Sequence, residues 1–195
     1  LQILKKNKIN NVIIEASSHG LEQKRLHNIN FKTAIFTNFS QDHLDYHKTM
    51  QSYLNAKLIL FKKILNKKAK IILDKNINQF NILKNIGKNR GLRIIETGEI
   101  IKKIKNISLN EKSDFKIKNL AMACLAAKLS GLKEKNILKS LKKIKDVNGR
   151  LELIKKFPNG VKVFIDYAHT PDALEKVLRS LNINYAKNIT LVFGC

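Results

Sequence analysis

The 195 residues are 44% hydrophobic and 27% charged, a composition that can bury a core within about one or two domains. The longest uncharged apolar run, 120–127, is far below the roughly 20 residues that span a bilayer. No signal-like segment opens the chain, so we expect a cytoplasmic protein with no membrane partner. The formal charge of +23 suggests nucleic-acid binding. However, the lysines are scattered and no nucleic-acid-binding motif organises them, so we expect a solvated basic surface and no nucleic-acid partner.

Short β-branched runs alternate with stretches of helical period along the chain, which is typical of an α/β protein with a mostly parallel sheet flanked by helices. In chain order the sequence predicts a helix over 1–6, strands over 12–15 and 33–37, a helix over 50–67, strands over 70–73 and 92–95, helices over 117–130 and 134–144, a strand over 161–166, a helix over 171–181 and a strand over 189–193.

A change from a lysine-rich helix to the segment VNGR predicts a division into two units, 1–147 and 148–195. Parallel strands near both ends would need neighbouring strands that these residues do not supply. We therefore expect both units to be incomplete.

The run DHLDYH places four metal-ligand side chains within six residues: Asp42, His43, Asp45 and His47. A metal site is one interpretation, since HxxxH puts two imidazoles on one face of a helix. A polar loop with capping aspartates is the other. The run alone does not decide between them.

Lys57 lies at the edge of an apolar stripe on the predicted helix over 50–67. The stripe consists of Leu54, Leu58, Phe61 and Leu65. A lysine at this edge either extends its ammonium outward along its methylenes or is partly desolvated, which lowers its pKa and makes the amine nucleophilic. A neutral amine can add carbon dioxide and become a carbamate that binds Mg²⁺ as a carboxylate would.

These residues carry a family resemblance. The segment TNFSQDHLDYH, followed by a tyrosine and an AK pair, resembles the signature of the Mur ligases. The resemblance implies that His43 is a catalytic magnesium ligand and that Lys57 is the catalytic carbamylated lysine. It also implies the fold of an incomplete Mur ligase central domain, followed by the start of a Rossmann-like α/β C-terminal domain.

The upstream motif IIEASSHGLEQKR is similar to that of the branch that adds the third residue of the stem peptide. By this resemblance Glu15 is a metal ligand, and Ser17, Gln23 and Arg25 bind the UDP-MurNAc-dipeptide. A guanidinium suits a carboxylate or phosphate, and ligands bind where strands of α/β sheets run into loops. Read without the resemblance, Glu15 is a surface acid and Arg25 an exposed charge.

Two downstream segments resemble the parts of the family that approach the nucleotide. FKIKNLAMACLAAKLSGL places Asn119 at a family asparagine, although Lys116 stands where relatives commonly have an earlier one. NGRLELI and VFIDYAHTPDALEKVL then place three further nucleotide-binding residues, Arg150, Asp166 and His169. Independently of function, Thr170 and Pro171 predict the start of a helix.

The function implied by the resemblance is ATP-dependent amide synthesis in peptidoglycan formation. With Mg²⁺, ATP phosphorylates the D-glutamate carboxylate of UDP-MurNAc-L-Ala-D-Glu, and a diamino acid, meso-diaminopimelate in preference to L-lysine, displaces the phosphate. The full-length enzyme is expected to be a monomer. No GxxxxGK[ST] phosphate loop occurs in these residues, so we expect the isolated chain to be inactive. The alternatives are another Mur or folylpolyglutamate synthase ligase, a basic nucleic-acid-binding protein and a metal-dependent hydrolase.

Overall fold

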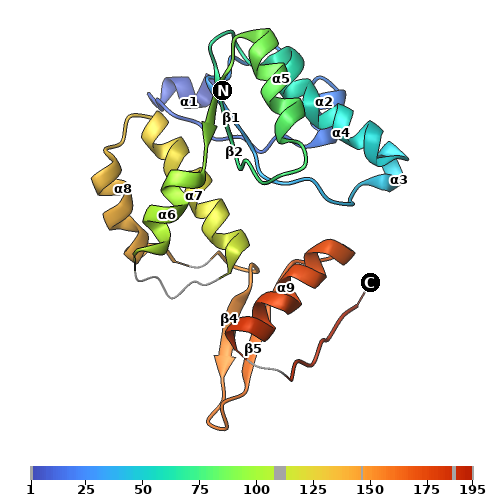
Figure 1. Ribbon diagram of the computed structural model, residues 1–195, viewed down its shortest axis with the longest axis vertical. Coiled ribbons are helices and arrows are strands. Elements are labelled where there is room, and N and C mark those ends of the chain that lie inside the picture. Colours follow the sequence, from blue (N-terminus) through green and yellow to red (C-terminus); the bar gives the residue numbers. More distant parts are fainter. Residues whose placement is uncertain (1, 108–112, 146, 186–187, 195) are drawn as a thin grey trace.

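A three-stranded parallel sheet forms the centre of the N-terminal part of the chain (Figure 1). The computed structural model describes residues 2–107, 113–145, 147–185 and 188–194. The strands are β1 (Thr33–Phe36), β2 (Lys70–Leu73) and β3 (Arg93–Glu96), in the order β1-β2-β3. The predicted α/β class with a parallel sheet is confirmed. β2, the central strand, is rich in β-branched residues and is buried over its last three positions, which is typical of a strand covered on both faces.

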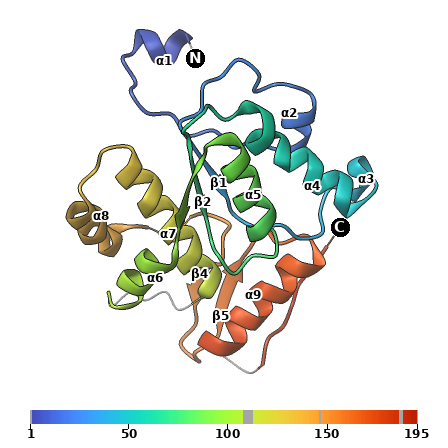
Figure 2. The ribbon, with the colours of Figure 1, turned by 45° about the horizontal axis from the view of Figure 1, so that its top comes forward.

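One face of the sheet is covered by α4 (Met50–Ile59), the π-helical turn Leu60–Ile64 that continues it, and α5 (Phe80–Arg90) (Figure 2). Residues of these helices form one hydrophobic cluster with β1 and β2. In that cluster the rings of Phe36 and Phe61 lie 5.8 Å apart. The predicted helix over 50–67 therefore forms, but it changes to π geometry at residue 60 and ends at 64.

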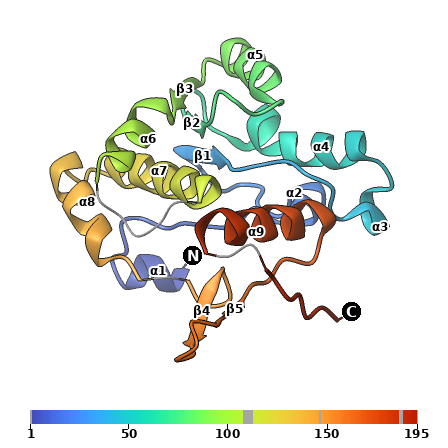
Figure 3. The ribbon, with the colours of Figure 1, turned by 60° about the horizontal axis from the view of Figure 1, so that its bottom comes forward.

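A second cluster joins α6 (Gly98–Lys105), α7 (Asp114–Leu129), α8 (Glu134–Ser140) and the 3₁₀ turn Leu141–Lys143 that follows α8 (Figure 3). α7 contacts both β1 and β2. Side chains alternate along β2, so Ile71 and Leu73 belong to the first cluster, whereas the fully buried Ile72 points to the opposite face and belongs to neither cluster.

The C-terminal part contains an antiparallel pair, β4 (Glu152–Lys156) and β5 (Lys162–Ile165), followed by α9 (Pro171–Asn184). α9 begins as the sequence predicts. Its N-cap is Thr170, whose hydroxyl accepts a hydrogen bond from the Ala173 N–H at 3.4 Å, and Pro171 occupies the first turn.

Two predicted strands are absent. Residues 12–15 run into α2 (Ser18–Glu22), and residues 189–193 follow α9, but neither segment forms a strand. Both are rich in β-branched and apolar side chains, yet Ile13 and Val192 are more than 90% exposed. A strand requires a hydrogen-bonded neighbour, and neither segment has one among the described residues.

The remaining elements are two short helices, α1 (Gln2–Lys6) and α3 (Leu44–His47). α3 is a single turn between two residues with left-handed backbone, His43 (φ 53°) and Lys48 (φ 65°). In the part of the chain that the structure describes, no helix is long and apolar enough to cross a bilayer.

Candidate metal and substrate site

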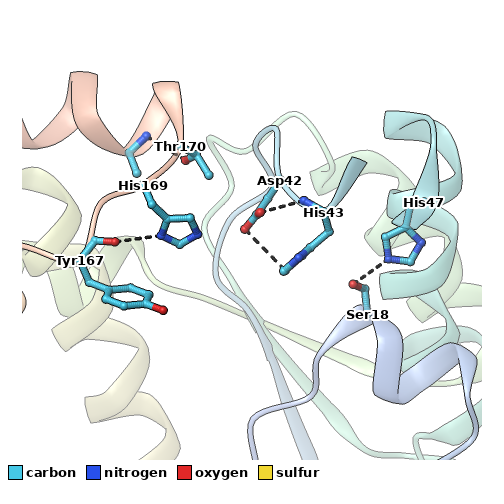
Figure 4. A network of polar contacts seen from close by, with 8 residues as sticks. Ser18, Asp42, His43, His47, Tyr167, His169 and Thr170 are labelled. Carbon is cyan, nitrogen blue, oxygen red and sulfur yellow. Dashed lines mark hydrogen bonds and ion pairs between the residues drawn. The ribbon is translucent and has the colours of Figure 1, made fainter. Parts of the chain in front are cut away.

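The DHLDYH run folds as a loop and one helical turn, not as an extended strand (Figure 4). Asp42 directly precedes this turn. Its Oδ1 accepts a hydrogen bond from the His43 N–H at 2.8 Å, and its Oδ2 lies 3.5 Å from His43 Nε2. The N-cap of α3 is His43 and no side chain caps the helix, so the capping interpretation of the aspartate is wrong. The Asp42 carboxylate instead lies beside the imidazole that the family resemblance assigns to the metal.

His47 has a structural role that the sequence did not reveal. It is 5% exposed, and its Nε2 lies 2.9 Å from the hydroxyl of Ser18, which is itself 2% exposed (Figure 4). Its Nδ1 lies 3.7 Å from Glu22. Burial is the largest influence on the imidazole and lowers its pKa, against the opposing charge of Glu22. These contacts join the DHLDYH run to the SSHGLEQKR motif.

Lys57 lies partly buried on α4, with its Nζ over the ring of Tyr53 at 5.0 Å from the ring centroid. Burial lowers the pKa of the amine, while the negative charges of Asp42 and Glu15 act in the opposite direction. Of the two outcomes considered for this lysine, the structure shows the desolvated one. The two carboxylates that act on it come from different motifs, and Glu15 is exposed at the end of the extended segment.

The donor chemistry around Lys57 is compatible with magnesium, which prefers oxygen ligands. In the described ranges, no three His, Cys, Asp or Glu side chains are grouped as a ready metal site. A carbamate on Lys57 would add two oxygen donors to the carboxylate of Glu15 and the imidazole of His43. The residues present therefore fit the metal through a modified lysine, not through a preformed cluster of unmodified side chains.

The residues predicted to bind the dipeptide substrate surround α2. Ser17 is the N-cap of α2, where its Oγ accepts a hydrogen bond from the Gly20 N–H at 3.1 Å. Gln23 is the C-cap, and Ser17, Gln23 and Arg25 are all exposed. The Gly20 position is close-packed, since an added Cβ would lie 3.1 Å from Ser17 Oγ and 3.7 Å from the Arg25 side chain.

Three of the predicted nucleotide residues lie around the start of β4 and the end of β5. The carboxylate of Asp166 accepts hydrogen bonds from the Leu151 N–H at 2.6 Å and the Ala168 N–H at 2.8 Å. The guanidinium of Arg150 lies over the ring of Tyr167 at 5.0 Å. His169 Nδ1 lies 2.9 Å from the Tyr167 carbonyl oxygen (Figure 4), which leaves Nε2 as the outward nitrogen.

These two hydrogen bonds give Asp166 a structural role that the sequence did not predict. Leu151 has a φ of 50°, a strained value for a leucine, and the carboxylate holds that backbone in place. Asn119, the fourth predicted nucleotide residue, is exposed on α7.

An open hollow of about 380 Å³ beside α1 contains none of the predicted site residues. It is lined by Gln2, Leu4, Lys5, Ile9 and Val12.

Comparison with known proteins agrees with the resemblance in the motifs. The profile of the Mur ligase middle domain matches residues 1–138, and that of the Mur ligase glutamate ligase domain matches residues 149–195. The chain is 38% identical to the UDP-N-acetylmuramoyl-L-alanyl-D-glutamate--2,6-diaminopimelate ligase of Wigglesworthia glossinidia brevipalpis, over 98% of this chain and 43% of the relative. The ligase of the same name from Rickettsia bellii (strain RML369-C) is also 38% identical, over 98% of this chain and 44% of the relative.

Solved structures show the same relationship. A structure of a UDP-N-acetylmuramoyl-L-alanyl-D-glutamate--2,6-diaminopimelate ligase superposes with a TM-score of 0.61 at 27% identity, over 86% of this chain and 39% of that one. MurF from Acinetobacter baumannii shares the fold alone, with a TM-score of 0.63 at 16% identity, over 78% of this chain and 37% of that one. The chain spans less than half the length of the relatives it matches, and it belongs to the Mur ligase family.

Proposed function

We propose that this chain is part of an ATP-dependent ligase that adds meso-diaminopimelate to UDP-MurNAc-L-Ala-D-Glu in the cytoplasm during peptidoglycan synthesis. The observation that carries the proposal is the environment of Lys57. Its amine is partly buried, burial lowers its pKa, and the negative charges of Asp42 and Glu15 interact with it. The names of the relatives supply the substrates and the amino acid.

On the metal side, Glu15 and His43 would hold the ion together with a carbamate on Lys57. Bound Mg²⁺ supplies neutralisation of the charge that develops on the transferred phosphoryl group. Asp42 orients His43 through the contact of its Oδ2 with the imidazole, and an oriented imidazole is the usual condition for a metal ligand.

On the substrate side, the exposed guanidinium of Arg25 suits a carboxylate or phosphate of the dipeptide substrate. Ser17 accepts a hydrogen bond from the Gly20 N–H, so its own hydroxyl proton remains available for donation. Gln23 offers an amide at the other end of the same short helix. These three residues would fix the substrate while its D-glutamate carboxylate is activated.

The nucleotide would be approached by Asn119 on α7 and by Arg150, Asp166 and His169 in the second unit, 148–195. Asp166 holds the backbone at Leu151 and Ala168, so its first effect is to fix the loop that carries Arg150. The Tyr167 carbonyl oxygen holds the His169 ring through Nδ1, which directs Nε2 outward.

A chimaera tests the proposal. This chain replaces the corresponding segment of a 2,6-diaminopimelate ligase, and ADP release is measured with UDP-MurNAc-L-Ala-D-Glu and meso-diaminopimelate. We expect ATP-dependent amide formation that Lys57→Ala lowers by about 100-fold or more, because several kcal/mol of charge stabilisation depend on the metal. The matched control is Lys63→Ala, at an exposed lysine of the π-helical turn, and it should keep the activity. Full activity in Lys57→Ala, or turnover without ATP, would refute the proposal.

The 195 residues contain no GxxxxGK[ST] loop, and such loops hold nucleotide phosphates with backbone N–H groups. We therefore also propose that the isolated chain does not form the amide by itself. ATP-dependent synthesis by the purified 195-residue chain would contradict this point. It would leave the assignment of the metal ligands intact.

A further inference from the structure

Tyr53 occupies the centre of a group of aromatic and imidazole rings. It lies on α4 and is 5% exposed. Its ring centroid is 5.1 Å from that of Phe39, 5.7 Å from that of His43 and 5.2 Å from that of His47. His43 meets it edge-on at 82°, whereas His47 stacks on it at 25°. One buried side chain thus touches both histidines of the DHLDYH run.

The same ring contacts Lys57. Tyr53 precedes Lys57 by four residues on one helix, a spacing that places two side chains on the same face, and the Lys57 Nζ lies 5.0 Å from the ring centroid. Tyr53 is therefore a direct bridge between His43 and Lys57, which lie fourteen positions apart in the sequence and are both proposed metal ligands.

Tyr53 is buried, but it belongs to neither of the two hydrophobic clusters. Burial, followed by the charge of Asp42, raises its pKa to about 12, so the phenol stays neutral. Its hydroxyl makes no hydrogen bond to any residue that the structure describes. The contacts of this side chain are made by the ring.

We propose that Tyr53 is a positioning residue of the metal site, whose ring fixes His43 and Lys57 relative to each other so that both reach one ion. This inference rests on the proposed function. A ring face also attracts an ammonium, so the ring does not by itself favour the neutral amine. Its contribution is to hold the lysine in one rotamer and to exclude water from one side of Nζ.

The adduct that Tyr53 would position forms without an oxidant or reductant. The neutral Nζ of Lys57 attacks the carbon of carbon dioxide, an N–C bond forms, and one C=O electron pair moves onto oxygen. Nζ then loses a proton to solvent. The product is a planar carbamate with one negative charge.

The test follows this adduct on the full 195-residue chain, by carbon-13 NMR in labelled bicarbonate at fixed pH. The parent chain should show a carbamate signal that Lys57→Arg lacks. Tyr53→Leu should lower it by about fivefold or more, because Lys57 regains rotamers and water. Tyr53→Phe keeps the ring and should keep the signal. Tyr46→Leu is the matched control, since Tyr46 is 40% exposed and its ring contacts His19 and His47, not Lys57.

Each outcome separates this inference from the function on which it rests. A parent chain with no Lys57 carbamate would overturn this inference, while the ligase function would still be tested by amide formation in the chimaera. A carbamate that persists in Tyr53→Leu would overturn only the role of Tyr53. Loss of the carbamate in Tyr53→Phe would also overturn the role of the ring, because it would assign the effect to the hydroxyl. Circular dichroism checks folding, and Tyr53→Met replaces Tyr53→Leu if that variant does not fold. Failure of both to fold would make Tyr53 a core residue and overturn the inference.

Discussion

At the scale of single residues, the contact between Ser18 and His47 connects the two motifs that identify the family. Ser18 lies in the first turn of α2 and His47 at the end of α3, and both side chains are buried. Their 2.9 Å contact fixes the position of the loop that carries His43 relative to the segment that carries Glu15. The geometry of the proposed metal site therefore depends on a hydrogen bond between two residues that are not ligands.

We predict that Ser18→Ala lowers the free energy of unfolding by about 1–3 kcal/mol, because it leaves a buried imidazole nitrogen without its partner. Urea denaturation followed by circular dichroism measures this. Ser40→Ala serves as the control. Its hydroxyl makes no hydrogen bond among the described residues, and it should cost less than about 0.5 kcal/mol. Equal stability of the two variants would contradict the structural role of Ser18.

The pH dependence of stability should report on His47. Burial lowers its pKa in the folded state below the ordinary value of 6.5, so the unfolded chain binds the proton first as pH falls. The contribution of neutral His47 is complete above pH 6.5 and is lost as pH falls from there through the folded-state pKa.

We therefore expect His47→Gln, which keeps polar contacts but does not titrate, to flatten the fall in unfolding free energy between pH 7.5 and pH 5.5. The difference should be up to about 1 kcal/mol per pH unit. Urea denaturation at both pH values measures it. His27→Gln changes an exposed histidine and should behave as the parent. If His47→Gln changed the free energy of unfolding by the same amount at both pH values, the imidazole would not contribute to the pH dependence of stability.

The sequence indicated residues that carry chemistry more readily than residues that support them. Glu15, His43 and Lys57 stand in motifs, and residue type alone suggested their roles. Ser18 and Tyr53 are supporting residues whose importance comes from tertiary contacts: Ser18 contacts His47, 29 positions away, and Tyr53 contacts rings of the preceding loop and turn. One signal was available for Tyr53, its i,i+4 spacing from Lys57 on a predicted helix.

At the scale of elements, Arg90 ties α5 to the end of the preceding helix. Its Nη1 donates to the Phe61 carbonyl oxygen and its Nη2 to the Leu65 carbonyl oxygen, both at 2.8 Å. These carbonyls belong to the π-helical turn and the residue after it, where helical hydrogen bonding ends. The two-pronged contact stabilises this end of the α4 segment, ahead of β2.

We predict that Arg90→Lys lowers the free energy of unfolding by about 1–3 kcal/mol, since an ammonium cannot reproduce the forked pair of hydrogen bonds. Thermal or urea unfolding tests this. Arg93→Lys makes the same change of side chain at an exposed position of β3 and should leave the free energy of unfolding nearly unchanged. If the two substitutions cost the same, the forked contact does not contribute to stability.

Elements were predictable where local pattern and tertiary contacts agree. β2 forms over 70–73 as predicted, because a β-branched run lies between two strands that pair with it. α5 and α6 were missed: asparagines of low helix propensity recur along α5, and isoleucines along α6. Their apolar spacing, such as Phe80, Leu83 and Ile86, was the usable signal. β4 was also missed, since a run with three charges in five residues gives a weak strand pattern.

At the scale of the whole molecule, burial is distributed unevenly along the chain. Both hydrophobic clusters lie before residue 142. In the described part of 148–194 only Leu151 and Ser180 are buried. Two paired strands are marginal without a covering layer, and apolar residues of β4 and β5 remain exposed: Leu153, Ile154, Val163 and Ile165.

We predict that amide hydrogen exchange in β4 and β5 is faster, by at least about tenfold, than exchange in β2, because few buried contacts resist local opening there. Mass spectrometry of deuterated peptides measures both regions in one sample. The amides of Ile71, Ile72 and Leu73, whose residues are fully buried, are the internal reference. Equal protection would show that the C-terminal strands are as stable as the central sheet.

The fold class was predictable because the alternation of strands and helices is a property of the whole chain. The two missing strands could not be excluded in the same way. Residues 12–15 and 189–193 have the composition of strands, but pairing depends on a neighbour, which a local pattern does not report. The division into 1–147 and 148–195 stays a prediction.

The left-handed backbone of His43 has a consequence for the balance between stability and activity. A histidine at φ 53° is disfavoured relative to glycine by an amount of order 1 kcal/mol, whatever its side chain binds. Natural selection for stability alone would therefore tend to replace this residue. Its presence marks a position where the chain gives up folding free energy, and directed evolution of this chain for heat resistance alone should select against His43 early.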